Sequence, residues 1–470
     1  MNIHTAYEEG YLVSSEASIS EGSTCCAIPQ EAYRTLESEI RNWKDENNPP
    51  WGLLRAIKGS NAIRLKQYAG LISCSDGTAI EILPKIGRIE QGSAEGDKKS
   101  AIETRARSAL VRMMCCLPAF RHIRHQEANL ATECGSLLEI YLMAFLSSVQ
   151  IIIQQGLRRD YIEREENLSV LRGRLLITAQ LRENLLRADR FYTRHDEYSE
   201  DRPINRLIAT ALRITLRRCS SVKAQRLARE LTLIFEDIPD SHRPDLDFQK
   251  VRLDRGMQYY REALDWARLI INMLSPVSVK GEHRAVSLLF PMAQLFEAYV
   301  AHHLKHQLKE GYALSSQSGR EYLIMHNSNK DQINPKRIFQ LRPDLLIKKQ
   351  VEKEKIYALV LDTKWKLISS DLNDNKESIY GKEPYGLSQS DIYQLYTYGS
   401  HYLGGEGEVI LIYPETDQFK VPLPVFNFCK TTSLRLWVLP FCLEKPRLVL
   451  PSSDSRLSDY LDINDPGPIS

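Results

Sequence analysis

Two hydrophobic periodicities alternate along the chain and divide it into β-rich and helical segments. Apolar and polar positions alternate over residues 63–66, and a Ser-Asp-Gly turn at 75–77 precedes an apolar run at 79–83. A period of two is typical of a half-buried strand, and serine, aspartate and glycine are typical of a turn. The pattern predicts a β-rich module with one helix over residues 1–88, followed by a polar linker at 90–100.

The period then becomes helical. Apolar residues recur at steps of three and four from residue 101 to about residue 274, which predicts a middle helical domain over 101–280. The most apolar stretch, 137–153, is interrupted by Glu139 and other polar residues. Because it is shorter than the roughly 20 apolar residues that a membrane span needs, we expect a buried helix and no membrane association.

The third region, 281–450, mixes both periods. It predicts helices at 292–308 and 388–402 and strands at 340–348, 356–366 and 408–413. The polar segment 451–470 is expected to be a loose tail. The predicted fold class is therefore multidomain α/β, with a β-rich N-terminal module, a helical middle domain and a C-terminal α/β core.

Charge changes this picture only locally. The 470 residues include 62 basic and 60 acidic ones, a net charge of +2, so nucleic-acid affinity would have to come from patches. Arginines are dense over 158–194, where they could contact phosphates or a protein partner. Acidic residues are interspersed there, so an ion-paired, solvated surface is an equally good interpretation.

The cysteines indicate a reducing compartment. There are nine of them, an odd number, and no C-x-x-C occurs, which argues against a disulfide framework or a zinc ribbon. The first residues carry Glu8 and Glu9 where a signal peptide needs basic and apolar segments, so we expect a mature N-terminus and a cytoplasmic protein.

Two groups of histidine and cysteine are candidate metal sites. One is His302, His303 and His306, and the other is Cys115, Cys116, His122, His125 and Cys134. Neither group has a recognised metal-ligand spacing, so both are interpreted as structural, with metal binding as the alternative.

Candidate chemistry lies at the ends of two predicted strands. Asp344 follows Pro343 at the start of one strand, and Asp362 and Lys364 end the next on one face, because side chains alternate with a period of two. If the two strands form a hairpin, Asp344 lies exposed beside Asp362. Such a pattern also arises by chance, but charged residues that end an apolar strand are often functional.

Magnesium is the cofactor that this arrangement predicts. Mg²⁺ prefers oxygen ligands from one or two carboxylates and keeps open positions for water and phosphate. It can polarise a phosphodiester and activate water, while Lys364 stabilises the charge that develops on the phosphoryl oxygens.

Four elements in order carry a family resemblance: Glu297 in LFEAYV, Pro343-Asp344, Asp362-Thr363-Lys364, and Gln394 to Tyr398 in QLYTY. They resemble the PD-(D/E)xK nuclease superfamily, including the Q-x-x-x-Y element of its RecB-like branch. Within it, the segments IEILPKI at 80–86, LRGR at 171–174 and DIYQLYTYG at 391–399 are similar to the McrC family, the nuclease subunits of McrBC type IV restriction systems.

The resemblance implies a role for each matching residue. Asp344 and Asp362 would bind the metal, Lys364 would be the catalytic lysine, and Glu297 would be a supporting acid. Gln394 and Tyr398 would line the site and meet DNA, although packing against the sheet is their alternative role. Glu297 could equally be a helix-surface glutamate that pairs with Lys305 or His302.

The resemblance also implies partners. They are a hexameric, McrB-like AAA+ GTPase, self-association on that ring, and modified double-stranded DNA containing 5-methylcytosine. No phosphate-loop motif occurs in this chain, which fits a motor in another chain. The N-terminal and helical regions would contact the ring. Two other functions remain open, namely a non-catalytic adaptor of a ring motor and a nucleic-acid-binding protein without catalysis.

Overall fold

The computed structural model describes residues 3–14, 25–42, 54–56, 62–74, 76–87, 97–117, 136–274, 285–316, 321–326, 336–351, 354–371, 376–378, 381–429, 433–451 and 455–461. The chain forms two compact units. The first is mainly 134–287, together with the short segments 1–2 and 73–79. The second contains 3–72, 80–133 and 288–470. The chain is mixed α/β, as predicted.

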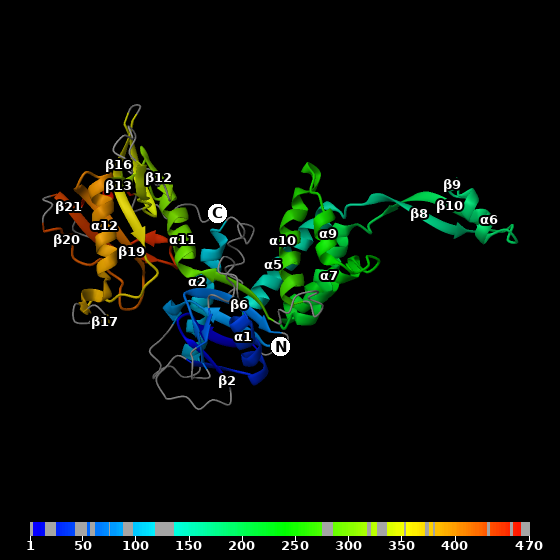
Figure 1. Cartoon of the computed structure of the whole chain (residues 1–470), viewed down its shortest axis with the longest axis horizontal. Helices are drawn as coiled ribbons and strands as arrows, with labels where there is room; N and C mark the ends of the chain where they lie inside the picture. The colour runs from blue at the N-terminus through cyan, green and yellow to red at the C-terminus, as the bar shows by residue number, and fades with distance from the viewer. Residues whose placement is uncertain are drawn as a thin grey trace. The chain divides into compact units, whose positions relative to one another are not determined.

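The first unit has a helical body, shown in green and cyan in Figure 1. Its elements are α5 (Leu137–Gln155), α7 (Pro203–Arg218), α8 (Val222–Ile234), α9 (Pro244–Lys250), the 3-10 helix η4 (Arg255–Tyr260) and α10 (Arg261–Leu274). Pro203 begins α7 at a position where its missing N–H has no intrahelical partner. The Glu139 carboxylate accepts hydrogen bonds from the N–H groups of Ser220 and Ser221 just before α8. That contact explains a charged residue inside an otherwise apolar helix.

Helix α5 confirms the prediction of a buried helix at 137–153. By length and composition alone it could cross a membrane, and it is the one such helix among the described residues. However, 72% of its most apolar window is buried inside the protein. A core helix has this property as well, so the finding is weak evidence for a membrane span.

The arginine-rich segment is a β-ribbon and not a helical segment, which corrects the helical interpretation of this stretch. Strand β10 (Phe191–Ser199) pairs with β8 (Asp160–Leu168) and with β9 (Arg174–Leu175), and the short helix α6 (Ile177–Glu183) lies at the end of the ribbon (Figure 1). Gly173 is needed here because it has a φ of +72° and a Cβ would lie 2.4 Å from the Arg194 carbonyl oxygen.

Two small sheets and the helices around them form the N-terminal part of the second unit. One sheet has the order β1 (Ile3–Tyr7), β7 (Ala79–Leu83), β6 (Tyr68–Cys74), β11 (Ala285–Pro291), and the other β3 (Cys25–Ile28), β2 (Tyr11–Ser14), β5 (Ala62–Leu65), β4 (Leu54–Ala56). The helices are α1 (Gln30–Asn42), the 3-10 helix η2 (Lys85–Gly87) and α2 (Asp97–Cys115).

Helix α2 is fastened to this module by a buried ion pair. The Arg107 guanidinium donates two hydrogen bonds of 2.7 Å to the Glu81 carboxylate of β7. Helix α2 belongs to the second unit, whereas the predicted helical domain of 101–280 includes it. The predicted ranges 1–88, 101–280, 281–450 and 451–470 stay predictions.

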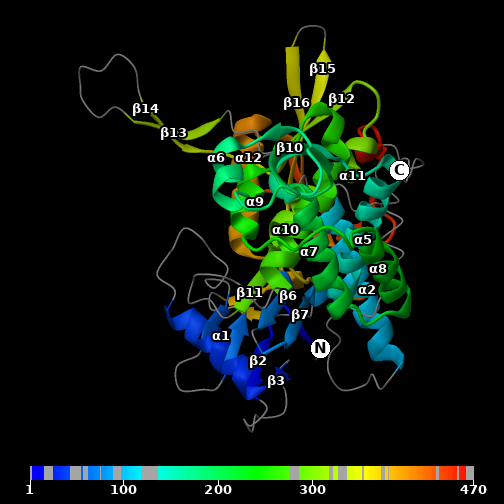
Figure 2. The ribbon, with the colours of Figure 1, turned by 90° about the vertical axis from the view of Figure 1, so that its right-hand side faces the viewer.

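The main sheet of the second unit carries the candidate site. Its strands run in the order β12 (Tyr312–Ser316), β15 (Leu345–Val351), β16 (Glu354–Thr363), β19 (Glu406–Pro414), β21 (Ser433–Cys442), β20 (Phe426–Asn427), and β22 (Arg447–Leu448) also pairs with β21. Strands β15 and β16 form an antiparallel hairpin whose outer ends extend past the other strands in Figure 2, while β16, β19 and β21 are parallel.

Helices cover both faces of this sheet. Helix α11 (Met292–His306) packs against β12 and β16, and α12 (Gln389–Tyr402) packs against β16 and β19 from the opposite side (Figure 1). Both predicted helices and the strand predicted at 408–413 are confirmed, whereas the strand predicted at 340–348 begins only at Leu345 and the one predicted at 356–366 ends at Thr363. The smaller elements are β13 (Tyr322–His326), β14 (Lys336–Gln340), β17 (Lys376–Ser378), β18 (Gly381–Glu383), the 3-10 helix η5 (Pro384–Gly386) and α13 (Ser455–Ser458).

Candidate active site

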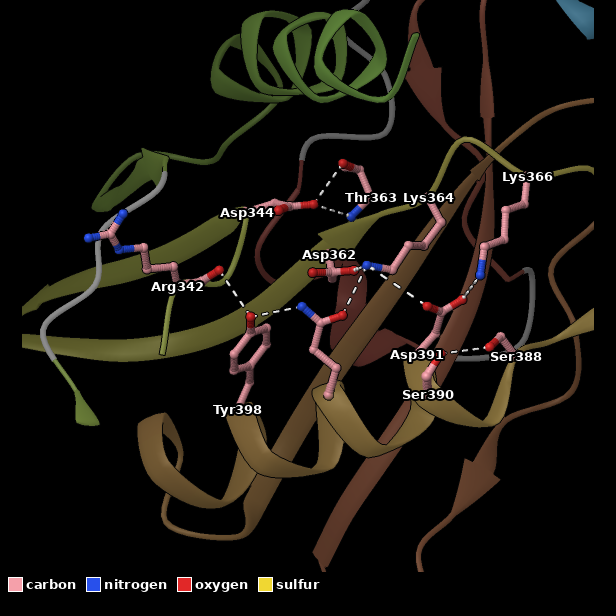
Figure 3. A network of polar contacts seen from close by, with 11 residues as sticks. Arg342, Asp344, Asp362, Thr363, Lys364, Lys366, Ser388, Ser390, Asp391 and Tyr398 are labelled. Carbon is pink, nitrogen blue, oxygen red and sulfur yellow. Dashed lines mark hydrogen bonds and ion pairs between the residues drawn. The ribbon is translucent and has the colours of Figure 1, made fainter. Parts of the chain in front are cut away.

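The two predicted aspartates meet at one end of the β15–β16 hairpin. Leu345 pairs with Leu361, so Asp344 and Asp362, the next residues outward, come together as predicted. Asp344 is half-buried and not exposed as expected. The cause is Thr363, whose backbone N–H and hydroxyl each donate a 2.8 Å hydrogen bond to the same Asp344 oxygen, Oδ2 (Figure 3).

Asp362 is a fully buried carboxylate with one close cation. Its Oδ2 lies 2.6 Å from the Lys364 Nζ. Within the part of the chain that the structure describes, neither carboxylate oxygen accepts a well-directed hydrogen bond. Burial, and then the nearby charge of Asp344, raises the pKa of Asp362 to about 7. A buried carboxylate that packing does not supply with directed hydrogen bonds is suited to binding a cation.

Lys364 connects the strand to α12. Its Nζ donates a 3.0 Å hydrogen bond to Gln394 Oε1 and lies 4.0 Å from Asp391 Oδ1. Burial lowers the pKa of Lys364, but the charge and hydrogen bond of Asp362 outweigh burial, so the pKa is raised overall. Lys364 is therefore an ammonium that carries a fixed positive charge into the site.

Gln394 and Tyr398 hold that lysine in place. The Gln394 amide donates a 2.8 Å hydrogen bond to the Tyr398 hydroxyl, which donates a 3.0 Å bond to the backbone carbonyl of Arg342 (Figure 3). The four-residue spacing places Gln394 and Tyr398 on one face of α12, as predicted. The chain of bonds thus runs from Lys364 back to the entry of β15, two residues before Asp344.

Close packing of α12 makes these bonds possible. A Cβ on Gly399 would lie 2.7 Å from a Leu434 methyl group and 3.0 Å from one of Val409. A larger residue here would have to displace these methyl groups, so glycine favours the close approach of this turn of α12 to the sheet.

Two charged residues of the site were not predicted. Asp391, in the first turn of α12, is buried and accepts a 2.6 Å hydrogen bond from the Lys366 Nζ (Figure 3). A signal was present, because Asp391 lies three residues before Gln394 and Lys366 lies two after Lys364, so each shares a face with a predicted site residue.

Glu297 lies on α11, which covers the face of the sheet opposite to that covered by α12. The preceding residue, Phe296, packs its ring 5.3 Å from that of Trp365, which follows Lys364 in the chain. Glu297 itself is partly buried. Its role as a supporting acid stays a prediction.

The donor set fits a hard divalent cation. Asp362 offers two buried oxygens that accept no directed hydrogen bond from the described residues, and Thr363 fixes the orientation of the Asp344 carboxylate beside it. Oxygen-only donors from two carboxylates match what Mg²⁺ prefers. Asp344 and Asp362 are the residues that would hold the ion.

A second buried carboxyl supports the site from the N-terminal module. Glu8, in the turn after β1, accepts hydrogen bonds from the Trp365 Nε1 at 2.5 Å and from the Lys85 backbone N–H at 2.9 Å. Burial raises the pKa of Glu8 to about 7. This contact links the module to the residue beside Lys364.

The Glu8 carboxyl predicts a pH-dependent stability. Its folded-state pKa of about 7 lies above its ordinary value of 4.5, so the stability present at low pH is lost as pH rises toward and through 7. Glu8→Gln stays neutral and keeps an acceptor for Trp365, so we expect it to be more stable than the native chain by up to about 3 kcal/mol near pH 8 and no more stable near pH 4. Denaturant unfolding at both pH values measures the difference, and an equal effect at both would contradict the assignment.

Comparison with known proteins identifies the family. The model of the McrBC 5-methylcytosine restriction system component family matches residues 63–414. No curated protein matches the chain. One similar solved structure is described as a half-complex from a tetradecameric assembly of Thermococcus gammatolerans McrB AAA+ hexamers with bound McrC.

That match has a TM-score of 0.59 at 18% identity and covers 94% of this chain and 95% of the other, so it supports the fold. The cryo-EM structure of the T. gammatolerans McrBC complex matches less well, with a TM-score of 0.43 at 19% identity over 64% of this chain and 86% of that one. The family match spans most of the chain, including every predicted site residue. The chain belongs to the family of McrBC 5-methylcytosine restriction system components.

Proposed function

We propose that this chain is the DNA-cleaving subunit of a modification-dependent restriction complex, and that it hydrolyses phosphodiesters with Mg²⁺. The observation that carries the proposal is the convergence of Asp344, the buried Asp362 and the Lys364 ammonium at one end of a hairpin. Two carboxylates and a lysine suit phosphodiester hydrolysis, whereas a purely structural hairpin gains nothing from burying Asp362.

Each residue has a defined task in this reaction. Asp344 and Asp362 hold the ion, which when bound supplies Lewis acidity toward the phosphate and activates water. Lys364 donates to the phosphoryl oxygens and stabilises the charge that develops on them. Gln394 keeps the ammonium in position, and Tyr398 keeps Gln394 in position. Fixed donors of this kind need no reorganisation during the reaction.

The proposed protein partner is an McrB-like hexameric AAA+ GTPase. The fold is that of a structure in which McrC is bound to McrB AAA+ hexamers. The end of the β8–β10 ribbon offers a surface for such a contact, because it exposes large apolar side chains, namely Val170, Leu171, Ile177, Leu181, Leu185 and Leu186. Exposed apolar residues grouped in this way are typical of a protein-binding site.

Three arginines of the ribbon fit a protein contact better than a phosphate-binding groove. Arg164 pairs with Glu197 at 2.5 Å, Arg194 with Glu165 at 2.5 Å, and Arg159 with Glu200 at 2.7 Å. Cations already paired on the surface have less charge to offer to phosphates.

We expect a substitution in the ribbon to weaken stimulation of the partner without affecting the stability of the chain. Leu186, 95% exposed near α6, contributes little to the fold, so Leu186→Asp should leave thermal stability unchanged. It should weaken stimulation of the partner's GTP hydrolysis by at least about tenfold, as expected for loss of one buried interface anchor. The matched control is Val222→Asp, also strongly exposed but on the helical body, which should keep full stimulation. Equal stimulation by both variants would contradict the role of the ribbon.

Reconstitution tests the function. The chain is combined with an McrB-like AAA+ GTPase, GTP, Mg²⁺ and DNA with or without 5-methylcytosine, and each component is left out in turn. We expect cleavage of methylated DNA only in the complete mixture. Stimulated GTP hydrolysis without any cleavage would instead identify a non-catalytic adaptor.

A further inference from the structure

The fold brings together residues from two groups that are far apart in the sequence. Cys116 lies just beyond the end of α2, and His302 and His303 lie on α11. The Cys116 sulfur and one ring nitrogen from each histidine all lie within 4.8 Å of one another. No local spacing could have indicated this group, because Cys116 comes from one predicted set and the histidines from the other.

The chemistry of the group differs from that of the candidate active site. A thiolate and two imidazoles are softer donors than carboxylates, and they suit Zn²⁺ and similar ions and not Mg²⁺. Zinc takes sulfur at about 2.3 Å and nitrogen at about 2.0 to 2.1 Å, so small rotations of half-exposed side chains would converge the three donors. His302 is exposed and the other two are partly buried, which leaves room for water as a fourth ligand.

The surroundings hold the histidines and offer competing thiols. The Tyr299 ring contacts the His303 ring edge-to-face at 4.6 Å, and the His302 and His303 rings lie 4.9 Å apart. Cys115 and Cys442 are other thiols near Tyr299: burial raises the pKa of the Tyr299 hydroxyl, and the charges of these thiols raise it further. Neither belongs to the group of converging donors, so they provide controls for the identity of the sulfur ligand.

We propose that Cys116, His302 and His303 bind one zinc ion that fastens the end of α2 to α11. Such an ion would join two helices that are each attached to other parts of the second unit. Helix α2 is tied to the N-terminal module by Arg107 and Glu81, and α11 places Phe296 against the Trp365 that follows Lys364. A metal between the two helices would resist their separation within the second unit.

Cobalt spectroscopy tests the ligands directly. The whole chain is freed of metal with a chelator and titrated with Co²⁺, a spectroscopic substitute for zinc. We expect one equivalent to bind with a thiolate-to-cobalt charge-transfer band. Cys116→Ser should abolish that band, and Cys442→Ser should retain it. Absence of a thiolate band in the native chain, or a band that survives Cys116→Ser, would overturn the proposal.

A second variant tests the site even if Cys116→Ser does not fold. His302→Gln changes an exposed side chain, so its circular dichroism should match that of the native chain, while its zinc affinity should fall by at least about tenfold, because even the loss of a hydrogen-bond partner of a ligand has an effect of this size. Zinc should raise the unfolding temperature of the native chain and of Cys442→Ser, because it binds the folded state, and should raise that of His302→Gln by less at the same concentration. The same zinc-induced rise in all three would reject His302 as a ligand.

Discussion

Replacing Lys364 by alanine should lower the rate of DNA cleavage by about 10²- to 10³-fold, the usual effect of removing one preorganised donor from a developing negative charge. The ammonium lies 2.6 Å from Asp362 and is held by Gln394, whereas the neighbouring Lys366 ammonium is bound to Asp391. Single-turnover cleavage with the partner GTPase and Mg²⁺ measures the effect. GTP hydrolysis should be unchanged, because Lys364 belongs to the second unit and not to the ribbon.

A lysine on the same unit serves as the control. Lys420 forms an exposed ion pair of 2.9 Å with Asp417, so Lys420→Ala removes a lysine next to an aspartate without touching the site. Its cleavage rate should equal that of the native chain. Lys364→Arg should not restore activity, since the broader guanidinium does not fit the contact between Asp362 and Gln394. Cleavage by Lys364→Ala at the native rate would remove this residue from the mechanism.

Replacing Asp344 by asparagine should act through the metal. The change removes one of two carboxylate ligands but keeps an oxygen that can accept the hydrogen bonds of Thr363. We expect divalent-metal affinity to fall by about 10- to 100-fold, with cleavage reduced at least as much at a fixed metal concentration. Binding of Mn²⁺, followed by electron paramagnetic resonance, measures the affinity without requiring DNA.

The contrast between the two variants separates metal binding from charge stabilisation. Lys364→Ala should keep or increase the affinity for Mn²⁺, because it removes a competing cation from Asp362. Asp417→Asn should change neither affinity nor cleavage. Native metal affinity in Asp344→Asn would contradict the assignment of Asp344 as a ligand.

The sequence predicted the parts of the site that depend on local periodicity. The alternation along β16 placed Asp362 and Lys364 on one face, and the hairpin placed Asp344 beside them. Asp391 and Lys366 were missed because their contact depends on how closely α12 docks on the sheet. Their spacing from Gln394 and Lys364 indicated a shared face, but the contact between them depends on the packing of Gly399 against distant residues, which the spacing does not give.

The ribbon shows where periodicity misleads. Strands β8 and β10 carry charged residues on both faces and bury almost no apolar side chains, so they lack the alternation that identifies a half-buried strand. Cross-strand pairs stabilise them instead, such as Arg194 opposite Glu165. The helical pattern on either side of this stretch was therefore extended across it.

Contacts between segments far apart in the sequence could not be predicted either. Glu8 was noted only because it argues against a signal peptide, yet its carboxyl accepts a hydrogen bond from Trp365, the neighbour of Lys364. A buried acid cannot be recognised from sequence when its donors come from separate segments. The link is nevertheless specific, because an unpartnered carboxyl at this depth would be costly.

The most direct test of the central claim compares native chain with Asp362→Ala in the complete complex, under conditions in which both stimulate GTP hydrolysis equally. The account predicts that Mg²⁺-dependent cleavage falls by at least about a thousandfold, since the variant loses the buried metal ligand and the partner of Lys364. Cleavage of methylated DNA by Asp362→Ala at the native rate would contradict it.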